Sequence, residues 1–243
     1  MLKAKANGIT VLKYIPLKEL HSTGALINLM GAFVMGAIMK YIIMCGGPRS
    51  GKPLRVINNE SIISRTIRLL RDNGVTDIAI STNDDRYQQY DVPILRHHNP
   101  LTWDGFCWLN TFYPIRDPAC FIYGDVFYSP EAIRTIVKTD TDDIEFFASA
   151  PPFSPLYHKQ WAEPFAFKVQ DTGHFFDCID KVKEMDAQHL FNRHPISWEL
   201  WQVIKGTPIN HVDYTNYIAI NDYTLDVDTD DQAQAIENMT GDA

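Results

Sequence analysis

The sequence predicts an α/β protein built on a doubly wound sheet. From residue 40 onward, short continuous apolar runs alternate with segments of helical periodicity. Continuous apolar runs are typical of parallel strands that are buried on both faces. The β-α-β order places helices on both faces of the sheet and a ligand at the carboxyl ends of its strands.

The first half of the chain begins with the apolar run at 41–44 and continues in strict alternation. Ile63, Ile67 and Leu70 lie on one face of the helix predicted over 61–73, and Gly74 ends that helix. Further strands are predicted at 75–81, 92–95 and 119–123, with a helix at 104–113. The order Ser-Pro-Glu at 129–131 predicts another helix start, because these residues favour the cap and the first turn.

The second half is less regular but contains the same kinds of element. Strands are predicted at 143–150 and 165–169, with strand-like segments near His211 and at 217–220. Helices are predicted at 175–185, at 197–204 and after Thr229, and no internal repeat is present. The tryptophans of the 197–204 helix, Trp198 and Trp201, are interpreted as core residues.

Residues 1–38 are interpreted as an N-terminal extension, and residues 39–243 as the functional domain. The apolar stretch at 24–39 is shorter than the roughly 20 residues that span a bilayer, so no membrane span is predicted. MKYIIMCGG, starting at Met39, looks like the beginning of a strand-first domain. We favour a dispensable leader or a wrongly assigned start, with a packed accessory helix and a membrane-surface anchor as alternatives.

Composition limits the classes of function. A chain of 243 residues fits one large domain, with or without an appendage. Its net charge of −8 argues against a nucleic-acid-binding surface but permits small phosphorylated ligands, which need only a few local cations. The four cysteines lack metal-ligand spacing, so we expect reduced thiols in a cytoplasmic protein. A homo-oligomer is compatible with this composition.

The loop CGGPRSGKPL, from Cys45 to Leu54, partly matches the ATP-binding phosphate loop G-x-x-x-x-G-K-[ST]. Pro53 occupies the position of the essential hydroxyl, and the next helix starts only near Ser61. We therefore reject a phosphate loop of that kind. Gly46 and Gly47 still permit close approach to a phosphate, and Arg49 and Lys52 can neutralise it.

Carboxylates follow two other predicted strand ends. Asp125 comes directly after the strand at 119–123, where a carboxylate faces the ligand crevice and can bind a hard cation such as Mg²⁺. In LDVDTDD, alternation places Asp226 and Asp228 on one face of an extended segment. Capping of the last helix explains Asp230 and Asp231 but leaves Asp226 without a structural reason.

Together these motifs resemble the nucleoside-triphosphate transferase superfamily, which includes sugar-1-phosphate nucleotidyltransferases and molybdenum-cofactor guanylyltransferase-like proteins. The resemblance begins with YIIMCGGPRSGKPLRVINNESIISRTIRLLRDNGVTDIAIS, continues through FIYGDVFYSPEAI and ends at LDVDTDDQAQAIE. It implies a Rossmann-like, doubly wound mixed sheet of the nucleotide-diphospho-sugar transferase type. It also implies a nucleoside triphosphate and a phosphorylated small-molecule acceptor as substrates, with release of pyrophosphate.

The resemblance also implies roles for individual residues. Arg49 and Lys52 bind the phosphates together with the glycines and stabilise the leaving pyrophosphate. Asp125 and Asp226 hold Mg²⁺, and Asp228 is the substitute ligand if the register differs by two.

The chain departs from the pattern at two points. The segment between Arg49 and Lys52 is shorter than in most relatives. Ala162-Glu163-Pro164 stands where many sugar-nucleotide members have Glu-Lys-Pro, so Lys168 is our candidate for the missing catalytic lysine. These departures keep two alternatives open: a non-catalytic nucleotide- or sugar-nucleotide-binding protein, and a related glycosyltransferase. The segment at 96–99, Arg-His-His-Asn, is interpreted as a solvated loop, with an edge of the nucleotide pocket as the alternative.

Overall fold

The computed structural model of the chain describes residues 2–6, 9–13, 39–157 and 159–241. The chain divides into two units, Met1–Ile38 and Met39–Ala243, which we describe separately. In the first unit, strands β1 (Leu2–Ala6) and β2 (Ile9–Lys13) pair antiparallel, a hairpin that the sequence did not predict. The predicted alternatives for residues 24–39 fall almost entirely outside the described residues.

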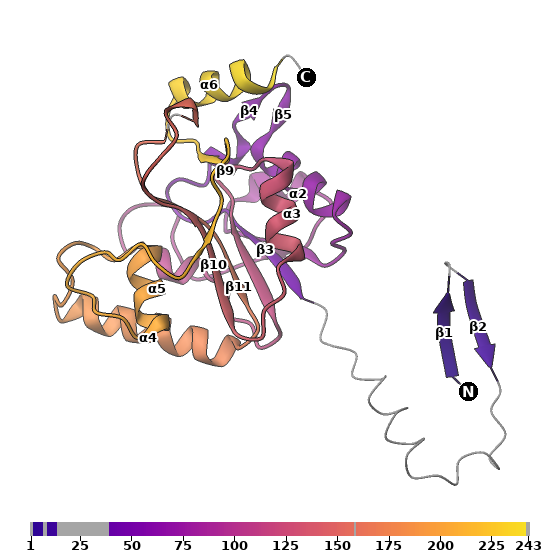
Figure 1. Ribbon diagram of the computed structural model, residues 1–243, viewed down its shortest axis with the longest axis horizontal. Coiled ribbons are helices and arrows are strands. Elements are labelled where there is room, and N and C mark those ends of the chain that lie inside the picture. Colours follow the sequence, from indigo (N-terminus) through magenta and orange to yellow (C-terminus); the bar gives the residue numbers. More distant parts are fainter. Residues whose placement is uncertain (1, 7–8, 14–38, 158, 242–243) are drawn as a thin grey trace, which may run out of the picture. The chain divides into compact units, whose positions relative to one another are not determined.

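The second unit is organised around a seven-stranded sheet with the order β12-β10-β11-β8-β3-β6-β7 (Figure 1). Its strands are β3 (Lys40–Met44), β6 (Ile78–Ser81), β7 (Ile94–Leu95), β8 (Ala119–Tyr123), β10 (Ile144–Ser149), β11 (Glu163–Val169) and β12 (Ile218–Ala219). All neighbouring strands pair parallel except that β11 is antiparallel to both β8 and β10. The predicted doubly wound mixed sheet is therefore confirmed.

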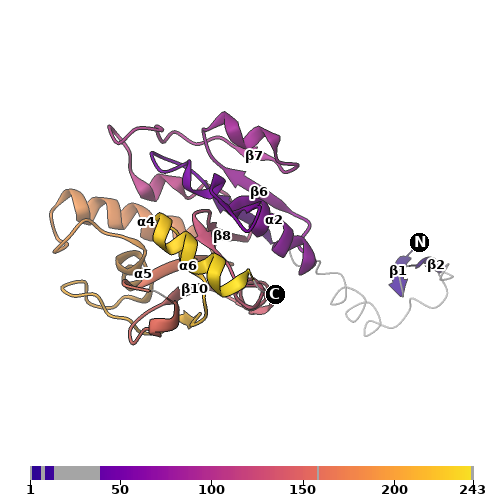
Figure 2. The ribbon, with the colours of Figure 1, turned by 90° about the horizontal axis from the view of Figure 1, so that it is seen from above.

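Helices cover both faces of the sheet (Figures 1 and 2). They are α2 (Ile62–Asp72) and α3 (Pro130–Lys138) on one face, and α4 (Thr172–Ala187) and α5 (Ser197–Lys205) on the other. A fifth helix, α6 (Asp230–Thr240), packs on a smaller core instead. A hydrophobic core lies on each face of the sheet, and alternate residues of β3 point into one or the other. Ile43 packs with α2 and α3, and Ile42 packs with α4 and α5. Trp198 and Trp201 are fully buried in the second core, as predicted.

The helix starts follow the predicted capping chemistry. Ser61 Oγ accepts the backbone N–H of Ser64 at the start of α2, and Ser129 Oγ accepts that of Ala132 at the start of α3. Each bond satisfies one of the N–H groups that a first helical turn leaves unpaired. These two starts therefore depend on local sequence and were predictable from it.

The helix predicted over 104–113 is largely absent. Only a short 3-10 helix, η4 (Trp108–Thr111), forms there. Gly105 has a positive φ of 72°, and the Asn99 side chain bonds both the N–H and the carbonyl of Cys107. The N–H and carbonyl of Cys107 therefore bond a side chain, which disfavours an α-helix that starts at 104. Trp103, Phe106 and Trp108 of this segment line a cavity that is described below.

A small third core supports the C-terminal carboxylates. Strands β4 (Val56–Ile57) and β5 (Glu60–Ser61) form a hairpin, while β13 (Leu225–Asp226) pairs antiparallel with β9 (Val126–Phe127). Ile57, Phe127, Leu225 and Ile236 of α6 share one buried cluster. Packing between these distant segments therefore positions Asp226.

In the described part of the chain, no helix is long and apolar enough to cross a membrane.

A chain that begins at Met39 is expected to fold by itself, because the three described cores are built from residues 39–236. Its thermal midpoint should stay within about 3 °C of the full-length value. Differential scanning calorimetry of the two chains tests this. An insoluble product, or a clearly lower midpoint, would show that the first 38 residues support the domain.

Candidate functional site

The glycine loop leaves the carboxyl end of β3 and does not enter an α-helix. It continues into a short 3-10 helix, η2 (Lys52–Leu54), and then into the β4–β5 hairpin. The Ser50 hydroxyl donates to Asp84 Oδ2 at 2.9 Å, and the Tyr87 hydroxyl donates to the Ser50 carbonyl at 2.5 Å. Both partners are buried, in or next to the 3-10 helix η3 (Asp85–Gln89), so the loop backbone is anchored independently of any ligand.

The two glycines at the start of the loop are required by packing. A Cβ atom on Gly46 would lie 2.3 Å from His97 Nε2, and one on Gly47 would lie 2.2 Å from Phe106 Cε2. Gly47 also has a φ of +80°. His97 and Asn99 are buried whereas Arg96 and His98 are exposed, so the interpretation of the 96–99 segment as a solvated loop is wrong for His97 and Asn99.

Three aspartates from two segments converge beside this loop. Asp125 follows β8 in the turn to β9, and its carbonyl accepts the N–H of Val227 at 3.1 Å. Asp226 lies in β13, opposite Val126 of β9. Asp228 follows two residues later, and its N–H donates to Gln232 Oε1 at 2.8 Å. The β9–β13 pairing therefore gathers the predicted metal ligands at one place.

Lys52 reaches into the centre of these aspartates. Its Nζ lies 3.6 Å from Asp125 Oδ2 and 3.8 Å from Asp226 Oδ1, and it contacts Asp228 Oδ1 directly. Arg49 Nη1 lies 3.5 Å from the same Asp228 oxygen. Both predicted phosphate-binding cations are thus paired with carboxylates.

Asp226 is the carboxylate least well compensated. Its Oδ1 atom is buried without a hydrogen-bond partner. Burial, followed by the nearby charge of Asp125, raises the pKa of Asp226 to about 8. Glu163 contributes to this environment, because its Oε2 accepts the Asp226 N–H at 3.3 Å and burial raises the pKa of Glu163 to about 7. A buried carboxylate oxygen that lacks a hydrogen bond and has Lys52 Nζ 3.8 Å away suits a cation.

Within the described ranges, no three histidine, cysteine or acidic side chains are arranged as a ready-made metal shell. Lys52 stands among the carboxylates instead. The donor set of carboxylate oxygens and the unpartnered Asp226 Oδ1 fit a hard divalent cation such as Mg²⁺.

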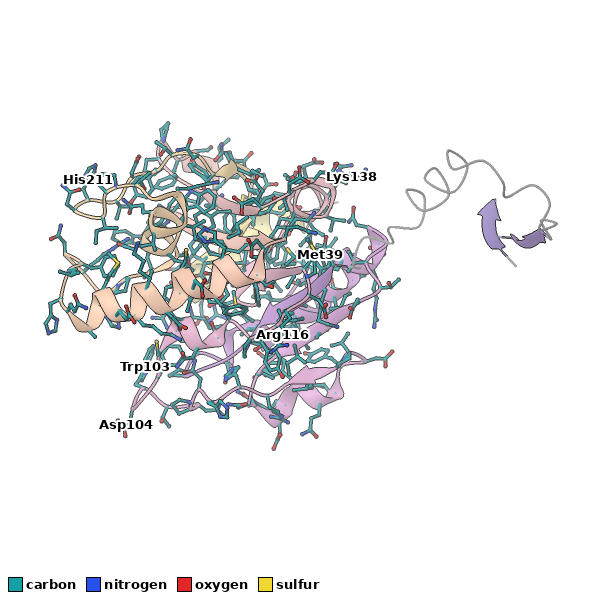
Figure 3. All side chains as sticks on the ribbon, turned by 90° about the horizontal axis from the view of Figure 1, so that it is seen from below. Met39, Trp103, Asp104, Arg116, Lys138 and His211 are labelled. Atoms are coloured by element: carbon teal, nitrogen blue, oxygen red, sulfur yellow. The ribbon has the colours of Figure 1, made fainter. Side chains whose placement is uncertain are left out.

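A cavity of about 540 Å³ opens next to Asp125 and the glycine loop. Trp103, Phe106 and Trp108 form an aromatic wall, and Tyr123, His194 and Ile196 lie among the other lining residues. Trp103 is 64% exposed and is labelled in Figure 3, and the Arg49 guanidinium carbon lies 5.7 Å from its ring centroid. The cavity therefore combines flat apolar surface with a few charged groups, as small-molecule sites commonly do.

The prediction that Lys168 is catalytic needs correction. Its Nζ donates to the carbonyls of Ile136, Val137 and Thr139 at the end of α3. Because β11 runs antiparallel to β8, moving from Glu163 to Lys168 leads away from the site: Lys168 pairs with Cys120 near the start of β8. Figure 3 shows Lys138, at the end of α3, on the side of the domain away from Trp103.

Comparison with known structures supports the fold. No protein-family model and no curated protein matches the sequence. Among solved structures, the chain is similar to nucleotidyltransferases. Because the sequence identity is low, this similarity concerns the fold alone. The nucleotide-diphospho-sugar transferase fold that the motifs predicted is confirmed.

Three solved structures illustrate the likeness. A protein assigned as a glucose-1-phosphate thymidylyltransferase from Bacillus anthracis gives a TM-score of 0.52 at 15% identity, covering 84% of this chain and 96% of that one. The 4-diphosphocytidyl-2C-methyl-D-erythritol synthase from Anaerococcus prevotii gives 0.52 at 11%, with 85% and 99% covered. The CTP:phosphocholine cytidylyltransferase from Streptococcus pneumoniae gives 0.49 at 13%, with 83% and 98% covered.

The raised pKa of Asp226 predicts a pH-dependent stability that asparagine should remove. Without metal, the folded state favours the protonated carboxyl below about pH 8, whereas the unfolded chain ionises near its ordinary value of 3.8. The contribution of Asp226 to the free energy of unfolding is therefore greatest below pH 4 and is lost as the pH rises toward 8. Between pH 6 and 9, the wild type should lose at least about 1 kcal/mol more than Asp226→Asn.

Urea denaturation in the presence of a chelator measures this difference. Asp231→Asn makes the same chemical change at an exposed position in the first turn of α6 and should follow the wild type. Parallel pH profiles for wild type and Asp226→Asn would contradict the prediction.

Proposed function

We propose that this protein is a Mg²⁺-dependent nucleotidyltransferase that transfers a nucleoside monophosphate from a nucleoside triphosphate to a phosphorylated sugar or related acceptor. The observation that carries the proposal is the convergence of Lys52 with Asp125, Asp226 and Asp228. These groups lie at the carboxyl ends of β3 and β8, where doubly wound sheets bind their ligands. The nucleotidyltransferase activities named for the similar folds support the same reaction class.

The reaction forms one P–O bond and breaks another. A phosphate oxygen of the acceptor attacks the α-phosphorus, the bond from that phosphorus to the bridging oxygen breaks, and pyrophosphate leaves with the electron pair. Charge develops on the leaving group, so cations aimed at it lower the barrier. Lys52 and Arg49 are the two cations of the glycine loop, and each can exchange its carboxylate partner for a phosphate oxygen.

The carboxylates have a complementary role. Asp125 and Asp226 would hold Mg²⁺, and Asp228 would position Lys52 and Arg49, which it contacts in the free protein. When bound, Mg²⁺ neutralises phosphate oxygens and increases the electrophilicity of the α-phosphorus. The aromatic wall of Trp103, Phe106 and Trp108 offers stacking surface to a planar base, and Tyr123 and His194, which also line the cavity, are available to the acceptor.

Product analysis tests the reaction class. A thermal-shift screen with the four common nucleoside triphosphates and Mg²⁺ identifies the donor, because binding to the folded state raises the thermal midpoint. Incubation of that nucleotide with phosphorylated sugars should then release pyrophosphate and no inorganic phosphate. Release of a nucleoside diphosphate from a nucleotide sugar would instead indicate a glycosyltransferase. Tight binding without any product would indicate a non-catalytic binding protein.

A further inference from the structure

Lys52 lies among the aspartates where a divalent cation would bind, and it is also a predicted phosphate-binding residue. Its side chain is only 15% exposed, although lysine side chains usually extend into water. The ammonium lies within 4.0 Å of a carboxylate oxygen on each of the three site aspartates, and it donates a hydrogen bond to Asp228 Oδ1. The Lys52 ammonium is therefore the cation that faces all three site aspartates at close range.

A divalent cation cannot join this arrangement without cost. A divalent cation held about 4 Å from an ammonium group is repelled by it, and this repulsion is stronger at a protein surface than in bulk water. The carboxylate oxygens that face Lys52 are also the atoms that a metal ion would use. A metal ion that binds first must therefore displace the ammonium from the aspartates.

A polyphosphate offers the displaced ammonium a new partner. Lysine is a compact charge on a flexible four-carbon stem, so its head can move while its backbone stays in place. The loop backbone is anchored through Ser50, which is bonded to both Asp84 and Tyr87. The exchange of partners thus requires movement of the Lys52 side chain alone.

We infer that Lys52 is an internal competitor of the divalent cation, occupying the aspartate cluster in the free protein and leaving it when nucleotide provides phosphate oxygens. This inference rests on the proposed function, because it assigns the cluster to a metal and Lys52 to the phosphates. Its consequence is that metal and nucleotide favour each other's binding through the position of one side chain. Metal alone binds weakly, and the complete site assembles only with substrate.

Titration with Mn²⁺ in the absence of nucleotide tests the inference. Free Mn²⁺, measured by its electron paramagnetic resonance signal, reports binding without requiring turnover. Lys52→Met and Lys52→Gln should both bind Mn²⁺ roughly tenfold or more tightly than the wild type, because the competing charge is gone. In a chelator, both variants should melt below the wild type, and Mn²⁺ should raise their melting temperatures by more.

Arg55→Met is the matched control, because Arg55 pairs with Asp230 rather than with the site aspartates. It removes one positive charge nearby and should leave Mn²⁺ affinity within about twofold of the wild type, since partly exposed charges are screened. An equal increase in Arg55→Met would reveal a general charge effect and overturn the inference.

Two further outcomes separate this inference from the proposed function. If wild type and Lys52→Met bind Mn²⁺ equally and Asp125→Asn weakens both, the metal site stands and the competition is overturned. If none of these proteins binds Mn²⁺, the competition is again overturned and the metal assignment fails with it. The pyrophosphate assay, which uses the wild type alone, still decides the reaction class.

Discussion

Replacing Asp125 with asparagine is expected to abolish Mg²⁺-dependent nucleotide binding and to lower the rate of pyrophosphate release at least about a hundredfold. Asp125 combines three features that the other carboxylates share only in part. It lies one glycine beyond the end of β8, it lines the 540 Å³ cavity, and its Oδ2 lies 3.6 Å from Lys52 Nζ. Asparagine keeps the shape and one oxygen but removes the negative charge on which a hard cation depends.

The measurement is nucleotide affinity with and without Mg²⁺, by isothermal titration calorimetry, together with the rate of pyrophosphate release. Asp117→Asn is the control, because Asp117 is exposed and precedes β8 at its other end. Asp226→Asn should weaken Mg²⁺-dependent binding strongly, and Asp228→Asn should weaken it less. A larger loss in Asp228→Asn than in Asp226→Asn would show that the ligand assignment is displaced by two residues.

Replacing Lys52 with methionine is expected to lower kcat by about 100- to 1000-fold and to raise KM by much less. The negative charge on the β- and γ-phosphates increases as pyrophosphate leaves, so a cation at this position stabilises the transition state more than the bound substrate. Methionine retains the length and apolar stem but cannot provide the charge. Saturating Mg²⁺ in the assay ensures that altered metal affinity does not limit the rate.

The control variants separate charge from structure. Lys52→Arg keeps the charge and should recover part of the rate, whereas Arg55→Met removes a nearby charge and should retain the full rate. A rise in KM at unchanged kcat would mean that Lys52 binds substrate and transition state equally, and the leaving-group role would then be wrong.

Most of the fold could be predicted because its signals are local. Apolar runs such as 41–44 and 119–123 are buried strands, and Ser61 and Ser129 cap the helices that their positions indicated. The rejection of an ATP-type phosphate loop also followed from local chemistry, since Pro53 lies in a single 3-10 turn, Lys52–Leu54, and no α-helix follows the loop directly. Each of these features depends on a few neighbouring residues, and tertiary packing strengthens them.

The errors came from features that depend on strand direction and on distant packing. Lys168 looked available as a catalytic lysine because it lies close to Glu163 in the sequence. The antiparallel direction of β11 carries it to the other end of the sheet, where three carbonyls hold it. The solvated loop interpretation of 96–99 failed for His97 in a related way, because His97 packs on Gly46 from a segment about fifty residues later in the sequence.

The amino-acid sequence by itself determined the alternation of strands and helices, the glycine loop with its two cations, and the aspartates that follow strands. Only the tertiary structure decided how those charges are paired. Lys52 and Asp228 are 176 residues apart, and no local sequence pattern predicts their contact. The β9–β13 pairing brings Asp226 beside Asp125, and Glu163 joins them from the strand that runs in the opposite direction. Local periodicity describes which face a residue takes, whereas the partner of a charge depends on which distant segments the packed core brings together.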